Sequence, residues 1–158
     1  MDESVIIREA RSKEEIQDFV MLVAEYLNSL PFELDFQDVE GELANPEREY
    51  SRNSGGVALV AYVQSAPVGC IGLRRLELGI GELKRMFVVP DYRGAGIAKE
   101  LCTRVLGIAR EVGYEAVKLD TVAEMIEAIS LYEGIGFVAT GRYRLNPLPS
   151  ARFFEIRL

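Results

Sequence analysis

A glycine-rich segment between an arginine and a lysine is the part of this sequence best suited to bind a phosphate group. It consists of Arg93, Gly94, Ala95, Gly96, Ile97, Ala98 and Lys99. Glycine allows unusual backbone dihedrals and a close approach to a ligand, and the first turn of a helix carries unpaired N–H groups and a partial positive charge. Apolar residues recur at helical spacing from Gly96 onward, so we expect a helix that begins here and holds an anion. The side chains of Arg93 and Lys99 could add positive charge.

Two other phosphate-binding motifs fit this segment less well. The Walker motif G-x-x-x-x-G-K-[ST] is absent from the sequence. The dinucleotide fingerprint G-x-G-x-x-G matches Gly94 and Gly96, but Lys99 occupies the third glycine position. A small dinucleotide-binding domain, with Asp120 as an acidic ribose contact, is therefore the weaker alternative.

The composition limits the chemistry that the remaining residues could perform. The chain of 158 residues contains no histidine, so acid–base catalysis would fall to carboxylates, tyrosine, lysine or water. Its net charge of −7 disfavours a nucleic-acid partner. Cys70 and Cys102 lack a C-x-x-C spacing, so we expect no disulfide and no metal, and we favour a cytoplasmic location. No apolar run is long enough to predict a membrane span.

The hydrophobic pattern predicts the elements that must position these groups. We expect strands at residues 5–8, 57–63, 68–73, 83–89, 116–119, 138–142 and 153–157, and helices at residues 12–30, 38–43, 96–112 and 123–134. Short turns join the three central strands, which predicts antiparallel neighbours, and a helix joins strands 83–89 and 116–119, which predicts one parallel pair. The sequence thus predicts one domain, residues 1–158, with an α/β sandwich. Its twisted sheet would be mixed and mostly antiparallel, with helices on both faces.

Two motifs in this order give the sequence a family resemblance. Arg93, Gly96 and Ala98 fit the pattern R-x-x-G-x-A, and residues 131–137 fit L-Y-x-x-x-G-F. The pair resembles the GNAT superfamily of acyl-CoA-dependent N-acetyltransferases, and the order of elements is similar over nearly the whole chain. The resemblance implies direct transfer of an acetyl group from acetyl-CoA to a primary amine of a small molecule or peptide, in a ternary complex without a metal. It also implies a possible homodimer. A non-catalytic acyl-CoA-binding sensor is the alternative.

The resemblance also implies where acetyl-CoA would bind. Its pantetheine arm would pair with the backbone of the strand before the glycine-rich turn, at Met86, Phe87 and Val88. Its pyrophosphate would bind N–H groups from about Arg93 to Lys99. A backbone N–H near Val88 would stabilise the oxyanion. Many family members carry an asparagine at a place that corresponds to about Met125 in this sequence, so one cofactor contact is expected to differ.

The same resemblance suggests the catalytic residues. Tyr132, within the second motif, would give a proton to the departing thiolate, although a tyrosine there could equally serve in packing. The general base would be Glu82, Asp120 or a chain of water molecules. Side chains alternate along a strand, so we expect Glu82 to share a face with Met86 and Val88. The structural alternatives are an ion pair for Glu82 and a turn cap for Asp120.

Two adjacent cations in the central strand complete the candidate site. Lys84 and Arg85 should point to opposite faces of the sheet because they are neighbours in a strand. They could form ion pairs with Glu82 or with the acidic segment at residues 33–49, or one of them could bind a substrate carboxylate. That segment could be a solvated loop or one wall of the substrate site. Further arginines that could join such a carboxylate site are Arg74, Arg75, Arg144 and Arg152.

Overall fold

The computed structural model describes residues 4–32 and 38–158, and seven strands of these residues form one sheet. The strands are β1 (Val5–Glu9), β2 (Val57–Val63), β3 (Ala66–Glu77), β4 (Ile80–Val88), β5 (Ala116–Val122), β6 (Val138–Ala139) and β7 (Ala151–Arg157). Their order across the sheet is β1-β2-β3-β4-β5-β7-β6. Only the β4–β5 contact is parallel, and the other neighbours are antiparallel. This confirms the predicted mixed, mostly antiparallel sheet.

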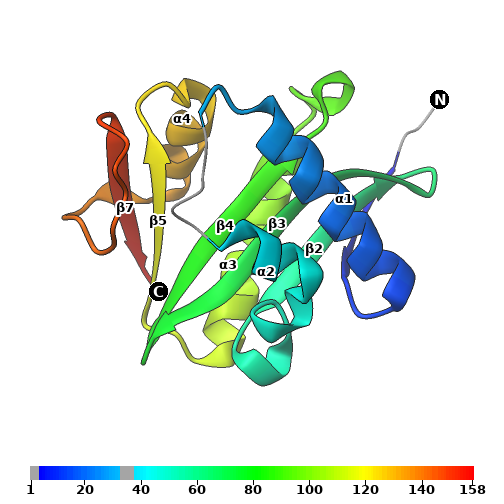
Figure 1. Cartoon of the computed structure of the whole chain (residues 1–158), viewed down its shortest axis with the longest axis horizontal. Helices are drawn as coiled ribbons and strands as arrows, with labels where there is room; N and C mark the ends of the chain where they lie inside the picture. Colours follow the sequence, from blue (N-terminus) through cyan, green and yellow to red (C-terminus); the bar gives the residue numbers. More distant parts are fainter. Residues whose placement is uncertain (1–3, 33–37) are drawn as a thin grey trace.

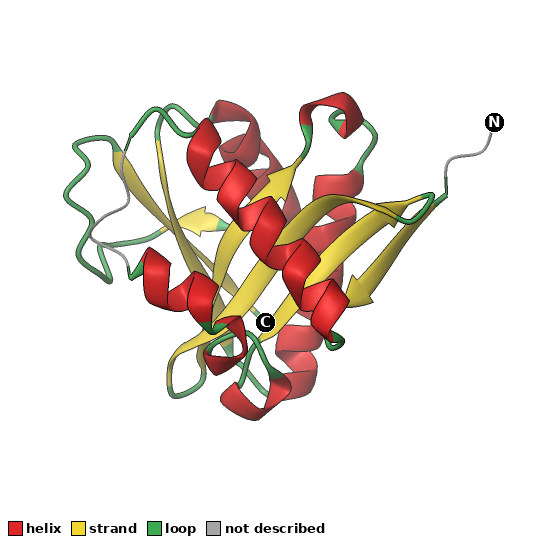
Figure 2. Cartoon of the chain, turned by 45° about the vertical axis from the view of Figure 1, so that its right-hand side comes forward, coloured by secondary structure: helices red, strands yellow, loops and turns green. Residues whose placement is uncertain are grey.

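Helices cover both faces of this sheet (Figure 1, Figure 2). They are α1 (Lys13–Ser29), α2 (Val39–Ala44), α3 (Ile97–Val112) and α4 (Ile126–Ile135). The first helix begins at a capping box, where the Ser12 hydroxyl accepts a hydrogen bond from the Glu15 N–H at 3.1 Å. Helices α1 and α2 lie on one face, and α3 and α4 on the other. Within the described residues, no helix has the length and apolar character that a membrane crossing requires.

Two apolar clusters fill the spaces between the sheet and its helices. The larger one joins α3 and α4 to the sheet, and its most buried members include Leu101, Val105 and Val117. The smaller one packs α1 on the opposite face, around Phe19 and Val23. The central strands are therefore buried on both faces, which makes β4 a rigid support for a site.

Strands β4 and β5 part from each other along their length. They pair only where residues 80–82 face residues 116–118. Beyond Glu82 and Lys118 the two strands diverge into a fork, which Figure 1 shows between the green and yellow ribbons. Past this point the facing edges of the two strands no longer bond to each other, so their N–H and C=O groups can accept another partner.

A β-bulge interrupts β4 within the fork. Cys70 pairs with Phe87 and Gly72 pairs with Lys84, so two residues of β4 stand opposite one residue of β3. Arg85 adopts a left-handed conformation with φ of 62°, which is uncommon for a residue with a side chain. Its carbonyl accepts a 3.3 Å hydrogen bond from the Cys70 thiol, which helps to hold the bulge. A bulge bends the strand and redirects the side chains that follow it.

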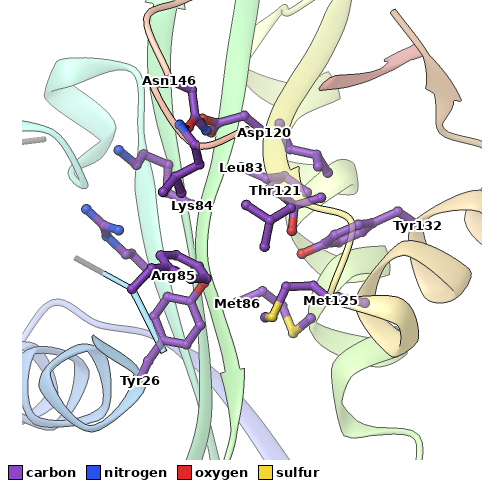
Figure 3. A pocket seen from close by; sticks show the side chains of 15 residues that line it. Tyr26, Leu83, Lys84, Arg85, Met86, Asp120, Thr121, Met125, Tyr132 and Asn146 are labelled. Carbon is purple, nitrogen blue, oxygen red and sulfur yellow. Dashed lines mark hydrogen bonds between the residues drawn. The ribbon is translucent and has the colours of Figure 1, made fainter. Parts of the chain in front are cut away.

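The bulge overturns two expectations about β4. Lys84 and Arg85 lie on the same side of the strand, and Met86 points to the other side (Figure 3). The prediction that the two cations point to opposite faces is therefore wrong. The prediction that Glu82 shares a face with Met86 and Val88 is also wrong, because the extra residue inverts the alternation. Met86 and Val88 pack with the α3 cluster instead.

The buried side chain of Arg85 ties β4 to α2. Its Nε and Nη2 atoms donate hydrogen bonds of 2.8 and 2.9 Å to the two carboxylate oxygens of Glu42. The side chains of Arg85 and Glu42 are only 3% and 6% exposed. The predicted pairing of a β4 cation with the acidic segment is confirmed here. Within that segment Glu42 lies inside the protein, whereas residues 33–37 are outside the described ranges.

We expect the substitution Glu42→Gln to lower the free energy of unfolding by about 3 kcal/mol, because it leaves a buried guanidinium without its carboxylate. Chemical denaturation at neutral pH measures this change. Glu47→Gln, an exposed position in the same segment, is the matched control and should change stability by less than about 0.5 kcal/mol. Equal stability of the two variants would contradict the structural role of the pair.

The same pair predicts a loss of stability in acid. Burial opposes ionisation of Glu42, but the Arg85 guanidinium outweighs burial and lowers the carboxyl pKa below its usual 4.5. A depressed folded-state pKa gives stability that is complete above the unfolded pKa and is lost as the pH falls through the folded value. We therefore expect wild-type stability to fall more steeply below pH 4.5 than that of Glu42→Gln. Parallel curves in acid denaturation would refute this origin.

Candidate active site

A pocket occupies the fork between β4 and β5 (Figure 3). Residues of β4 and β5 form its two sides, α1 and α4 with residues next to them close two others, and the segment between β6 and β7 contributes the rest. The lining residues are Tyr26, Phe32, Leu83, Lys84, Arg85, Met86, Leu119, Asp120, Thr121, Val122, Met125, Ala128, Tyr132, Asn146 and Leu148. Five predicted site residues therefore meet in one pocket: Lys84, Arg85, Met86, Asp120 and Tyr132. Their sequence positions span β4 to α4, so the fork is what assembles them.

Tyr132 enters the pocket from α4. The helix ends at Gly136, whose φ of 123° turns the chain back so that Phe137 packs edge-on against the Tyr132 ring at 5.7 Å. This local geometry explains the spacing of the second motif. The ring is only 7% exposed, and its hydroxyl oxygen points into the pocket (Figure 3). Burial raises the pKa of Tyr132 well above its usual value, so the hydroxyl remains protonated at neutral pH.

Tyr26 supplies a second phenol from the opposite side of the pocket. It projects from α1, and its ring lies 5.8 Å from the ring of Phe87. Burial raises its pKa, so this hydroxyl is also a proton donor at neutral pH. The position of Tyr26 in this pocket could not be predicted from the sequence, because Tyr26 lies among apolar residues at helical spacing. That spacing predicts only contact with a core.

Two cations line the wall of the pocket beside α2. Lys84 is 8% exposed and Arg85 is 5% exposed, and both side chains point to the same side in Figure 3. Burial, reinforced by the neighbouring Arg85, lowers the pKa of Lys84 to about 8. The ammonium is therefore mostly charged at pH 7 but close to titration. This part of the pocket has the chemistry to attract an anionic group.

Asp120 is the carboxylate that lines the pocket among the described residues. It lies on β5, is half-buried, and accepts a hydrogen bond of 2.9 Å from the Asn146 Nδ2 atom. The carbonyl oxygen of the Asn146 side chain in turn accepts the Leu148 N–H at 3.1 Å. Asn146 is buried, and sequence reasoning assigned it no role. Its position in a loop with two prolines was the only available signal.

Glu82 does not line the pocket and is fully buried. Its Oε1 atom accepts a 2.7 Å hydrogen bond from Arg74 Nε, and its Oε2 atom accepts bonds from Tyr143 at 2.6 Å and Arg144 at 3.0 Å. Burial opposes its ionisation, but the cations Lys84, Arg74 and Arg144 outweigh burial and lower its pKa. Its hydrogen-bond partners differ from the predicted Lys84 or Arg85, although the charge of Lys84 acts on it. Two of the arginines predicted for a carboxylate site thus bind a carboxylate of the protein itself.

The glycine-rich turn follows the end of β4. Gly94 and Gly96 have φ of 82° and 83°, and an added Cβ at either position would meet no atom within 4 Å. Gly96 is the N-cap of α3 and makes no side-chain hydrogen bond to the helix. Within the described residues, the N–H groups of residues 94–99 donate to no backbone carbonyl. The Arg93 Nε atom donates to the Val88 carbonyl at 2.9 Å. The turn therefore presents several free N–H groups in open space, beside the end of the fork.

The remaining predicted cofactor residues lie along β4 and α3. Phe87 directs its side chain into the α1 cluster, so only its backbone can contact a ligand. Val88 is buried beside the turn, Ile97 and Ala98 pack against the core, and Lys99 is exposed on α3. Among the described residues, no three histidine, cysteine, aspartate or glutamate side chains form a group that could hold a metal ion.

Comparisons with known proteins agree with this geometry. The sequence profile of the acetyltransferase (GNAT) family matches residues 21–137. An uncharacterized N-acetyltransferase of Schizosaccharomyces pombe is 30% identical over 156 residues, which cover 98% of this chain and 96% of the relative. The N-acetylaspartate synthetase of Danio rerio is 34% identical over 149 residues, but the match covers 88% of this chain and only 53% of that protein.

Solved structures give the same result for the fold. The crystal structure of a GNAT-family acetyltransferase from Staphylococcus aureus has a TM-score of 0.82, 28% identity, and coverage of 98% of this chain and 99% of that chain. A putative acetyltransferase of Salmonella typhimurium, solved with acetyl-CoA, has a TM-score of 0.73 and 17% identity, and the match covers 97% of this chain and 93% of that chain. The chain therefore belongs to the GNAT family of acetyltransferases, and it is an acetyl-CoA-dependent N-acyltransferase.

Proposed function

We propose that this protein transfers the acetyl group of acetyl-CoA directly to a primary amine in a ternary complex. The observation that carries the proposal is the continuity of the two halves of the site. The turn with free N–H groups lies at the end of β4, and the pocket with Tyr132 and Asp120 lies where the same strand parts from β5. A donor that extends along β4 would therefore bring its acyl group to the pocket.

The residues at hand fit acetyl-CoA. Open space at Gly94 and Gly96 and the free N–H groups of the turn suit a pyrophosphate, which binds well at a helix N-terminus. The unpaired edge of β4 suits the amide groups of the pantetheine arm, which would pair with backbone groups at Met86, Phe87 and Val88. Lys99 and the outer guanidinium nitrogens of Arg93 add positive charge at the exposed end.

Tyr132 is the proposed general acid. The attacking amine forms a bond to the thioester carbon, the carbon–sulfur bond breaks, and the departing thiolate takes a proton. Tyr132 donates that proton because its hydroxyl stays protonated and faces the pocket. A backbone N–H of the bulged part of β4, near Val88, stabilises the oxyanion before the carbon–sulfur bond breaks.

Asp120 is the proposed general base, acting directly or through water. An attacking amine must lose a proton, and Asp120 is the carboxylate of the described residues that lines the pocket. Glu82 was the base that the sequence favoured, but both of its oxygens accept hydrogen bonds from other side chains. We therefore propose that Asp120 accepts the proton of the amine. Asn146 donates a hydrogen bond to Asp120 and so orients its carboxylate.

Direct transfer needs no covalent enzyme intermediate. Both cysteines are free thiols inside the core, away from the pocket. Burial raises the pKa of the Cys70 thiol, and it raises the pKa of Cys102 to about 12, so neither forms a nucleophilic thiolate at neutral pH. The free thiols also agree with the reducing, cytoplasmic location that we propose.

We further propose that the acceptor carries a carboxylate near its amine. Lys84 gives one wall of the pocket positive charge beside the Arg85–Glu42 ion pair, and Asp120 gives the β5 side a carboxylate for the amine. Charge-assisted hydrogen bonds make such a cation a good partner for a carboxylate. One relative of this chain is named for the acetylation of an amino acid, aspartate, which is an amine of this class.

We expect Tyr132→Phe to lower kcat by about 100-fold or more, because it removes the proton donor for the thiolate. Release of free CoA thiol, measured with a panel of amines, amino acids and short peptides, reports the rate. Acetyl-CoA binding, measured by calorimetry, should not change. The matched control is Tyr62→Phe, since Tyr62 donates to Asp18 outside the pocket. An unchanged kcat in Tyr132→Phe would exclude the phenol as the acid, and binding without turnover for any acceptor would favour the sensor alternative.

We expect Lys84→Met to raise KM at least about 10-fold for amino acids but not for the corresponding amines without a carboxylate. We compare the kcat/KM of the wild type with that of Lys84→Met, using one acceptor at each pH. The ionisation of the acceptor affects both enzymes equally, so it cancels in the ratio of the wild type to the variant. This ratio should shrink as the pH rises through about 8, because the cationic form of Lys84 binds the carboxylate and is lost at high pH.

A conservative variant and a distant one test this assignment. Lys84→Arg should retain a preference for amino acids, because it keeps the charge. Lys13→Met, on the exposed start of α1, should resemble the wild type. An equal rise in KM for amino acids and for amines without a carboxylate in Lys84→Met would show that Lys84 does not bind the carboxylate.

A further inference from the structure

We propose that Glu82 is a positioning residue that fastens the segment between β6 and β7 over the acceptor pocket. This inference rests on the proposed function, because the segment at residues 140–150 supplies Asn146 and Leu148 to the pocket. Glu82 lies at the last β4 position that pairs with β5. It thus occupies the base of the fork, where one side chain can hold the covering segment to the sheet.

The contacts of Glu82 reach far along the sequence. Tyr143 and Arg144, which are 61 and 62 positions away, donate hydrogen bonds of 2.6 and 3.0 Å to its Oε2 atom. Arg74 on β3 donates to Oε1 at 2.7 Å and also binds Glu49 at 3.1 Å. The buried carboxylate therefore joins β3, β4 and the β6–β7 segment within one network of partly buried side chains.

The other strand of the fork holds the same segment a few residues later. Asn146 donates to Asp120 on β5 at 2.9 Å, and its backbone carbonyl accepts a 2.9 Å bond from Arg142. Asn146 is only 4% exposed. The segment is thus anchored to β4 through Glu82 and to β5 through Asp120. Release of the first anchor would loosen the second, because Asn146 follows Arg144 by two residues.

Ring contacts support the anchored conformation. The Tyr143 ring packs edge-on against Phe153 of β7 at 5.5 Å, and the Lys118 ammonium lies 5.5 Å from the ring centre. These contacts orient the phenol toward Glu82. Because Asn146 orients the proposed base Asp120, a loosened segment would disturb both the acceptor pocket and the proton acceptor.

The surroundings of Glu82 suit a positioning role and not the role of a general base. A base at this position would need an oxygen that an amine or a water molecule can reach, but Glu82 is 0% exposed and both oxygens accept bonds. The charged groups around it are Arg74 on β3, Lys84 on β4 and Arg144 on the covering segment, and the neutral phenol of Tyr143 also faces it. A carboxylate so held has the chemistry of a structural anion.

We expect Tyr143→Phe and Glu82→Gln to raise the acceptor KM about 10-fold or more while acetyl-CoA binding stays within about two-fold, because a small displacement of positioning groups is costly. Tyr143→Phe leaves the Glu82 carboxylate intact, so a base mechanism predicts little effect from it. The positioning mechanism predicts similar losses in both variants and little further loss in the double variant. An unchanged KM in Tyr143→Phe would overturn the inference.

Two further measurements separate the positioning role from the proposed function and from a role as general base. Hydrogen exchange of residues 140–150 should quicken in both variants, even if no acceptor is found and the proposed function fails. The acid limb of the pH–rate profile should keep its apparent pKa in Glu82→Gln, whereas loss of that limb would make Glu82 the base. If Glu82→Gln does not fold, Tyr143→Phe alone decides between the mechanisms. Matched controls are Glu9→Gln and Tyr62→Phe, which alter an ion pair on β1 and a hydrogen bond on β2.

Discussion

The parting of β4 from β5 is the constraint on which the rest of the structure depends. Two parallel strands that separate in the middle of a sheet leave backbone N–H and C=O groups facing each other without partners, and such groups are costly when they are buried without hydrogen bonds. The fork therefore requires a ligand or surrounding side chains to fill it. Helix α4 brings Tyr132, α1 brings Tyr26, and the bulge at Arg85 turns two cations to one side. Each of these elements thus places side chains in the opening between β4 and β5.

The charged side chains near the fork form two groups with different functions. Glu42 and Glu82 are buried and accept hydrogen bonds from arginines, and they hold α2 and the β6–β7 segment to β4. Asp120 and Lys84 lie on the pocket itself. Breaking a buried ion pair is costly because it leaves a charge in a medium of low polarity. The first group therefore gives the site its rigidity, and the second group is placed to meet a substrate.

Local signals in the sequence predicted the helices and strands and the glycine-rich turn. The capping box at Ser12, the turn at Gly94 and Gly96, and the strands and helices all depend on neighbours within a few residues. The bulge at Arg85 could not be predicted, because it depends on the pairing register of β4 with β3. Without the bulge, strict alternation placed Glu82 on the face of Met86 and Val88, which is the opposite face in the structure. The partners of Glu82 lie about 60 residues away and depend on the closed fold. The single-domain assignment stays a prediction.

This division between local and distant contacts explains why the sequence indicates the donor but not the acceptor. The turn and the second motif are continuous segments whose geometry is set by glycine and helix termini, so a short stretch of sequence is enough to indicate them. The acceptor pocket is assembled from α1, β4, β5 and the β6–β7 segment, which meet only after folding. Its shape depends on side chains such as Lys84 and Asn146 and on the anchor that orders the covering segment. Acceptor specificity can therefore change by substitution in these distant segments while the donor site and the fold persist.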